Sequence, residues 1–211
     1  MELVAPNWYA LKVFYNKVFE MEDKLASMGL PSYLAVEKVR LKGVDHMAAA
    51  RYLASLPEGA RADSRYIREG PVIYIRKPIV SSLIFVQATR EQILHLDVFL
   101  QENYRNGRGR GFVYKSADWQ DYAVIPDKQM AAFRLVTESG LSGLSFFSDD
   151  ELTRYKKGDR VRVTEGPLKG VEGYIRRIRK DRRLLVSIDG VIAVATSYIK
   201  PEFLEPVPEE E

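Results

Sequence analysis

Residues 158–175 read GDRVRVTEGPLKGVEGYI, and this stretch decides the fold of the C-terminal part of the chain. Val161 and Val163 alternate with polar residues, which is the period of a strand with one buried face. Gly166-Pro167 marks a turn, and Gly173 allows a sharp bend or a close backbone approach before a second strand begins. The stretch therefore predicts small, tightly turned β structure.

Three further strands complete this small domain. They are predicted at 184–188, 191–195 and 203–204, with Asp189-Gly190 as a two-residue hairpin signal. Together the strands predict a compact five-stranded barrel within residues 154–207. The spaced glycines after Val-x-Val resemble the KOW domain, an SH3-like barrel of transcription elongation factors and some ribosomal proteins; any small barrel with the same turns is the alternative.

The composition bounds the class of protein. The chain has 211 residues, enough for one large domain or, more comfortably, two smaller ones, and its 46% hydrophobic and 29% charged residues are ordinary for a soluble globular protein. It has no cysteine, which excludes disulfides and thiolate metal sites and suits a reducing cytoplasm. No apolar run reaches membrane-spanning length and no signal peptide is visible, so we expect a cytoplasmic protein. A net charge of +3 is too weak by itself to demand nucleic acid.

The first 138 residues alternate strands and helices. Strands are predicted at 7–14, 33–41, 79–88, 112–114 and 122–125. Three helices are predicted between them and at the end: one capped by Asn16 that runs to residue 28, one that a Thr89-x-x-Gln92 capping box opens and that runs to 103, and one that starts at 126. In the first strand Trp8, Ala10 and Lys12 fall on one face, and the residues between them fall on the other. This order predicts helices packed on a mostly antiparallel sheet, and hence an α+β fold.

Two segments interrupt this pattern. Residues 42–78 contain a short helix former and a short strand; a surface excursion and a specificity element that contacts a partner both fit. Residues 139–153 are rich in Gly and Ser and predict a flexible linker, from which Phe146-Phe147 could dock on either domain. Residues 208–211 predict an acidic tail.

The aromatic-led first strand, this order of elements, a linker and a C-terminal KOW-like barrel together resemble the NusG family of transcription factors. The chain is most similar to the specialised RfaH- and UpxY-type antiterminators, the latter associated with capsular polysaccharide operons, on overall similarity and on VIPDKQM at 124–130. The resemblance implies an NGN-type α/β sandwich at 1–138 that docks on the clamp helices of RNA polymerase and suppresses pausing. It also implies that the KOW domain recruits Rho or a ribosomal protein. No cofactor is expected.

Three apolar side chains carry the implied polymerase contact. Leu83 and Phe85 share one face of their strand, at positions where family members carry clamp contacts, and Trp8 is the third. The usual Phe-Pro-Gly-Tyr-like turn is replaced by Ile79–Ser82, and ordinary core positions are the alternative for Leu83 and Phe85. His95 lies near where RfaH-type proteins touch the opposite lobe of polymerase; a structural or merely exposed histidine is its alternative.

Three segments are candidates for nucleic-acid binding. They are Phe14, Tyr15, Asn16 and Lys17 at the first strand–helix junction, Arg105, Arg108 and Arg110 in a glycine-rich loop, and Arg176, Arg177 and Arg179 in a barrel hairpin. In specialised relatives the first junction holds the displaced non-template DNA strand, and aromatic stacking beside a cation suits unpaired bases. Binding of nascent RNA phosphates suits the hairpin arginines. A capped helix start and solvated turns are the alternatives.

The remaining assignments concern the KOW partner and the class of function. Leu168 occupies the position of an apolar partner contact in the KOW loop. We expect no enzyme, because His46 and His95 lack metal-ligand spacing and no Gly-x-Ser-x-Gly elbow is present. The alternatives to an operon-specific antiterminator are a ribosome-associated or general RNA-binding KOW protein and a general elongation factor.

Overall fold

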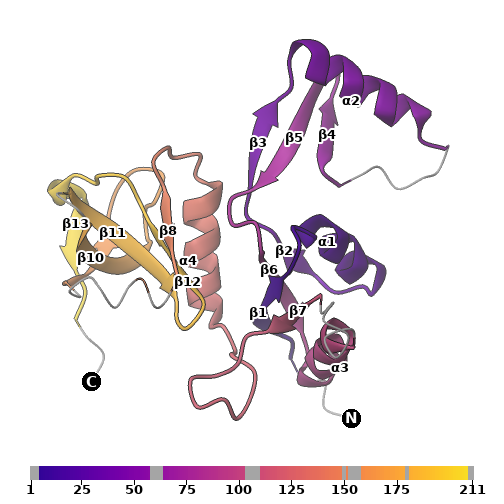
Figure 1. The fold of residues 1–211 in the computed structure, drawn as a ribbon. Coiled ribbons are helices and arrows are strands. Elements are labelled where there is room, and N and C mark those ends of the chain that lie inside the picture. Colours follow the sequence, from indigo (N-terminus) through magenta and orange to yellow (C-terminus); the bar gives the residue numbers. More distant parts are fainter. Residues whose placement is uncertain are drawn as a thin grey trace.

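The computed structural model describes residues 5–57, 64–102, 110–148, 151, 158–178 and 181–208. These residues form four α-helices and three antiparallel sheets (Figure 1), which confirms the predicted α+β class. The helices are α1 (Val18–Ser27), α2 (Gly43–Ser55), α3 (Arg90–Gln101) and α4 (Asp127–Glu138). None of these described helices combines the length and apolar character that a membrane crossing requires.

The first sheet has four strands in the order β2-β6-β1-β7. They are β2 (Ser32–Tyr33), β6 (Leu83–Ala88), β1 (Asn7–Val13) and β7 (Gly111–Val113). The predicted division of β1 into two faces is confirmed. Tyr9 and Leu11 pack with buried residues of α1 and α3, whereas Ala10 packs on the side of α4.

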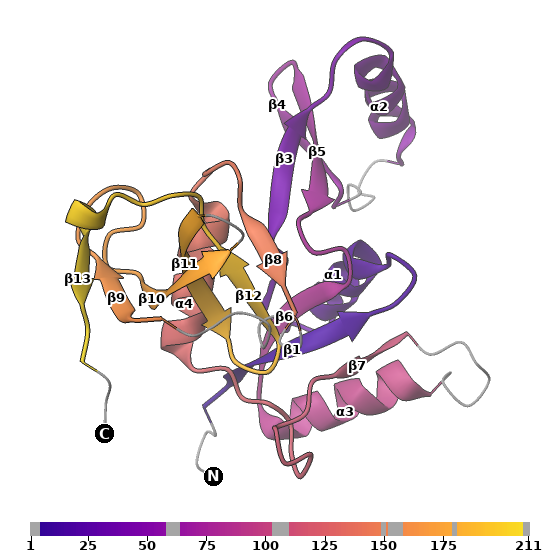
Figure 2. The ribbon, with the colours of Figure 1, turned by 60° about the vertical axis from the view of Figure 1, so that its left-hand side comes forward.

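Helix α4 lies between this sheet and a six-stranded C-terminal sheet (Figures 1 and 2). A row of aromatic rings crosses the helix: Phe85 lies 5.4 Å from Phe133 between ring centroids, and Phe133 lies 6.5 Å from Phe146. Tyr33 extends the row at 6.4 Å from Phe85. One hydrophobic core therefore runs from the first sheet through α4 into the C-terminal sheet.

The C-terminal sheet has the order β13-β9-β10-β11-β12-β8. Its strands are β8 (Ser145–Phe147), β9 (Arg160–Val163), β10 (Glu172–Ile178), β11 (Asp181–Ile188), β12 (Ile192–Ala195) and β13 (Leu204–Pro206), and a 3-10 turn at Pro201–Phe203 precedes β13. The five predicted strands are present. Gly173 makes the predicted close approach, since a Cβ there would lie 2.4 Å from the carbonyl oxygen of Leu185.

The predicted closed barrel is not observed. No described strand joins β13 to β8, which stand at opposite ends of the sheet. A closed barrel would need the free edge of β12, but β8 pairs with that edge. Strand β8 comes from the segment predicted to be a flexible linker. Phe146 and Phe147 hold it there by packing on the C-terminal core.

The third sheet, in the order β3-β5-β4, forms with α2 a unit that stands apart from the four-stranded sheet (Figure 1). Its strands are β3 (Val36–Arg40), β5 (Val72–Pro78) and β4 (Tyr66–Glu69). The prediction of one strand over 33–41 is wrong, because the buried pair Leu34-Ala35 separates β2 from β3 and the two strands join different sheets. We call residues 36–78 the 36–78 unit.

Three local predictions have mixed outcomes. The capping box of α3 is confirmed: the Gln92 amide donates to Thr89 Oγ1 at 3.3 Å, and the Thr89 amide donates to Gln92 Oε1 at 2.8 Å. The Asn16 cap is wrong, because α1 begins after Lys17 without a side-chain cap. The strand predicted at 122–125 is reduced to single bridges at Tyr122 and Ile125.

Candidate functional site

The predicted polymerase contacts Leu83 and Phe85 do lie on one face, but α4 covers that face. Leu83 is 5% exposed and Phe85 is 1% exposed. The exposed apolar patch predicted at these two residues is therefore wrong in this conformation, because Phe133 of α4 packs on Phe85. Trp8 packs at the margin of the same core and remains partly accessible.

Two other predicted contacts are separated from this face. His95 is exposed on α3, which packs on the opposite face of the four-stranded sheet. Leu168 is only 2% exposed, so the prediction of an exposed partner contact there is wrong in this conformation. The turn folds back on β9, with the Gly170 amide donating to the Val163 carbonyl at 2.7 Å, and this carries Leu168 into the core.

An aromatic strip lies along the open edge of the four-stranded sheet. We define it as Phe14, Tyr15, Phe112 and Tyr114. Phe14 lies 6.2 Å from Tyr15 and 6.0 Å from Phe112 between ring centroids, and Phe112 lies 5.4 Å from Tyr114. Tyr15 is 67% exposed and Phe112 is 39% exposed. A continuous row of rings at a sheet edge offers faces for stacking and an apolar contact surface.

The backbone at the end of the strip is strained. Tyr15 has φ 59° and Asn16 has φ 55°, in the left-handed region that bulky residues rarely adopt. This tight turn directly after β1 leaves the Tyr15 ring exposed instead of packing it. Strained turns that expose an aromatic side chain are often functional, so the turn supports Tyr15 as a binding residue.

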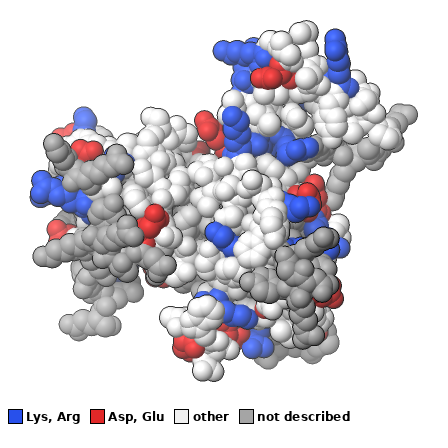
Figure 3. Space-filling model, in the orientation of Figure 1, with Lys and Arg blue, Asp and Glu red and all other residues white. Residues whose placement is uncertain are grey.

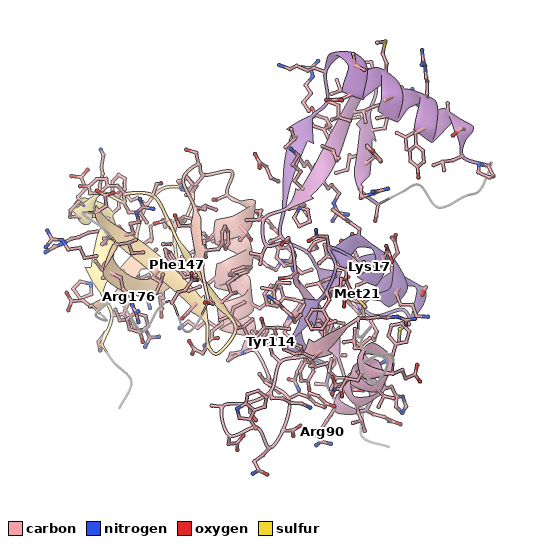
Figure 4. The ribbon with its side chains drawn as sticks, in the orientation of Figure 1. Lys17, Met21, Arg90, Tyr114, Phe147 and Arg176 are labelled. Atoms are coloured by element: carbon pink, nitrogen blue, oxygen red, sulfur yellow. The ribbon has the colours of Figure 1, made fainter. Side chains whose placement is uncertain are left out.

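A cationic groove lies beside Tyr15 on the α1 side. It has a volume of about 630 Å³, and its lining includes Tyr15, Lys17, Lys24, Phe99 and Arg110. The Arg110 guanidinium stacks over the Phe99 ring at 4.3 Å. Lys17 pairs with Glu20 at 2.8 Å on the exposed face of α1, and Figure 4 shows Lys17 near Met21 at this end of the helix. The predicted junction thus combines aromatic faces with positive charge.

The sequence did not identify Phe112 and Tyr114 as site residues. The register of β1 with β7 places Phe112 opposite Lys12, on the same face of the sheet, and the Tyr114 amide donates to the Ala10 carbonyl at 3.0 Å. Figure 4 labels Tyr114 below α4, and burial raises the pKa of its hydroxyl. The alternation in Phe112-Val113-Tyr114 indicated from sequence that the two rings share one face of a strand. The pairing of that strand with β1 could not be seen from sequence.

The basic hairpin of the C-terminal sheet is described in part. Arg177 and Arg182 are exposed and face each other across the hairpin of β10 and β11. Arg183 has a structural contact, because its Nη1 donates to Ser145 Oγ of β8 at 3.2 Å. Arg176 lines a cavity of about 770 Å³ between α4 and this sheet. Arg105, Arg108 and Arg179 lie outside the described residues.

Polar contacts hold α4 against the C-terminal sheet. Gln129 Nε2 donates to Asp189 Oδ2 at 2.8 Å, and the Asp189 amide donates back to Gln129 Oε1 at 3.2 Å. Lys128 pairs with Glu172 at 3.1 Å. Hydrogen bonds from Arg162, followed by the contact with Lys128, hold the pKa of Glu172 at about 2, against an ordinary value of 4.5.

The contribution of Glu172 to stability should depend on pH. Because folding lowers its pKa, the carboxylate stabilises the fold fully above pH 4.5, and this stabilisation is lost as the pH falls toward 2. We therefore expect Glu172→Gln to lower the denaturation midpoint at neutral pH and to lower it progressively less below pH 4.5. Urea midpoints measured for both proteins from neutral to acidic pH test this, and a difference that does not change with pH would contradict it.

The comparisons with known proteins add no assignment. No protein-family model matches the chain, and no curated protein matches it either. Within the described ranges, no group of three acidic or histidine side chains is placed to hold a metal ion. The chemistry that the described residues offer at the sheet edge is apolar contact, stacking and attraction of anions.

Proposed function

We propose that the chain is a non-catalytic transcription elongation and antitermination factor of the NusG-like type. In this proposal residues 1–138 form the NGN-type domain that binds the clamp helices of RNA polymerase. The C-terminal sheet corresponds to the SH3-like KOW domain and recruits a second partner, such as Rho or a ribosomal protein. Operons of the capsular polysaccharide type are the expected targets, by resemblance to UpxY-type proteins.

The observation that carries the proposal is the aromatic strip at the edge of the four-stranded sheet, where Tyr15 and Phe112 are exposed. Phe112 of β7 stands opposite Lys12 of β1, and Trp8 lies four residues before Lys12 on the same face of β1, so a partner helix packed across this face can reach both rings. Leu83 and Phe85 support this surface from within the core. The polymerase contact is therefore assigned to Trp8 and Phe112, and the non-template DNA contact to Tyr15 with Lys17 and Arg110.

Polymerase binding by the full chain tests the proposal. Aromatic anchors at interfaces contribute about 2 kcal/mol or more, so the double variant Trp8→Ala/Phe112→Ala should weaken binding of purified core RNA polymerase at least roughly 30-fold. Leu94→Ala is the matched control, because Leu94 is 46% exposed on the opposite side of the sheet. Circular dichroism should show that all three proteins are folded.

The result also separates the alternatives. Failure of the folded wild-type chain to bind polymerase would overturn the proposal. Retention of ribosomes or RNA by the same protein would then favour the RNA-binding KOW protein, for which Arg177 and Arg182 are the exposed candidates. Binding that survives in the double variant would instead remove Trp8 and Phe112 from the interface.

A further inference from the structure

The 36–78 unit carries an unusual share of the positive charge. Residues 36–78 contain nine Lys and Arg against five Asp and Glu, a net charge of +4, whereas the whole chain carries +3. The rest of the chain is therefore slightly acidic. Figure 3 shows Lys and Arg side chains gathered over this unit, at the top of the view. A basic element that stands apart from the main fold points to an anionic partner.

A groove between α2 and the three-stranded sheet concentrates this charge. Its volume is about 640 Å³, within the range of roughly 300–1,000 Å³ typical of ligand sites. The charged and aromatic residues that line it are Arg40, Lys42, Lys77, Asp45, Tyr52 and Tyr66. The three cationic side chains are exposed, and Lys77 stands opposite Glu37 in the pairing of β3 with β5.

Two tyrosines form an aromatic wall of the same groove. Tyr52 comes from α2 and Tyr66 from β4, and their ring centroids lie 5.8 Å apart at an interplanar angle of 50°. Tyr52 is 40% exposed. His46 Nε2 lies 3.0 Å from the Pro71 carbonyl oxygen and ties the first turn of α2 to the β4–β5 turn, so the two walls are held together.

We infer that this groove binds single-stranded nucleic acid. Lys42 and Lys77 attract backbone phosphates, and the ring of Tyr52 stacks on an unpaired base. A duplex hides its base faces, so it could use only the charges. The site lies outside the aromatic strip and does not depend on polymerase binding.

Binding of the full chain to labelled oligonucleotides tests the inference. The probes are oligothymidylate and oligouridylate of about 12 nucleotides, with the matching DNA duplex for comparison. Lys42→Gln/Lys77→Gln should weaken single-strand binding roughly tenfold and reduce the slope of log affinity against log salt by about 1.4, as for two lost phosphate contacts. Lys38→Gln/Lys200→Gln removes the same charge from exposed positions outside the groove and should change neither quantity.

Photo-crosslinking locates the contact. Oligonucleotides that carry 5-iodouracil should crosslink to the peptides that contain Tyr52 or Tyr66, and Tyr52→Leu should abolish the first crosslink. Three outcomes would each overturn the inference. The two double variants could bind with equal affinity and equal salt slopes, the crosslinks could fall only on other segments, or duplex and single strand could bind equally well. Displacement of the probe by a polyglutamate peptide at equal affinity would also overturn it, because the groove would then select charge alone.

Discussion

Replacing Phe85 by alanine is expected to lower the free energy of unfolding by about 4 kcal/mol, because it opens a cavity at a fully buried aromatic position. The Phe85 side chain is 1% exposed and lies between Tyr33 and Phe133 in the row of rings that crosses α4. Its loss removes packing from the sheet and from α4 together. Urea denaturation of the full chain, followed by circular dichroism, measures the change.

Phe112→Ala is the matched control for this measurement. Phe112 has the same side chain in the same sheet, but it is 39% exposed at the edge strand, so its loss should cost only about 1 kcal/mol. Equal, small losses for the two variants would show that α4 does not cover Phe85 in solution. The face of Leu83 and Phe85 would then be open to a partner, as the sequence alone suggested.

Much of the fold could be predicted from local sequence signals. The alternation around Val161, the close backbone approach at Gly173 and the capping box at Thr89 were each predicted from nearby residues, and each is present in the structure. The two faces of β1 follow from the period of a strand in the same way. These features need no knowledge of which elements are neighbours.

The features that sequence reasoning missed depend on long-range packing. Period two correctly puts Leu83 and Phe85 on one face, but it cannot say that α4 covers them. The Gly/Ser composition near residue 140 suggested a flexible linker, yet packing of the half-buried Phe146 and Phe147 against the C-terminal core stabilises β8 there. The aromatic strip was missed because it exists only when β7 pairs with β1.

Replacing Arg76 by methionine is expected to lower the free energy of unfolding by about 2 kcal/mol, because it leaves a partly buried carboxylate without its partner. Arg76 joins the 36–78 unit to α1 through two hydrogen bonds to Glu22, at 2.7 and 2.8 Å, and their side chains are only 17% and 19% exposed. The guanidinium also donates to the Ser64 carbonyl at 2.9 Å and stacks over Phe19 at 5.3 Å. This contact orients the basic groove relative to the main sheet.

A double variant separates two causes of this destabilisation, the unpaired charge of Glu22 and the lost packing of Arg76. If the cost arises from the unpaired charge of Glu22, then Glu22→Leu/Arg76→Met should recover most of the stability, since apolar replacement of both partners of a buried pair is often nearly neutral. The exposed pair Lys38–Glu69, at 3.5 Å, is the control, and Lys38→Met should change stability by less than about 0.5 kcal/mol. A double variant that is as unstable as Arg76→Met would show that the bidentate geometry, and not the neutralisation of Glu22, joins the 36–78 unit to α1.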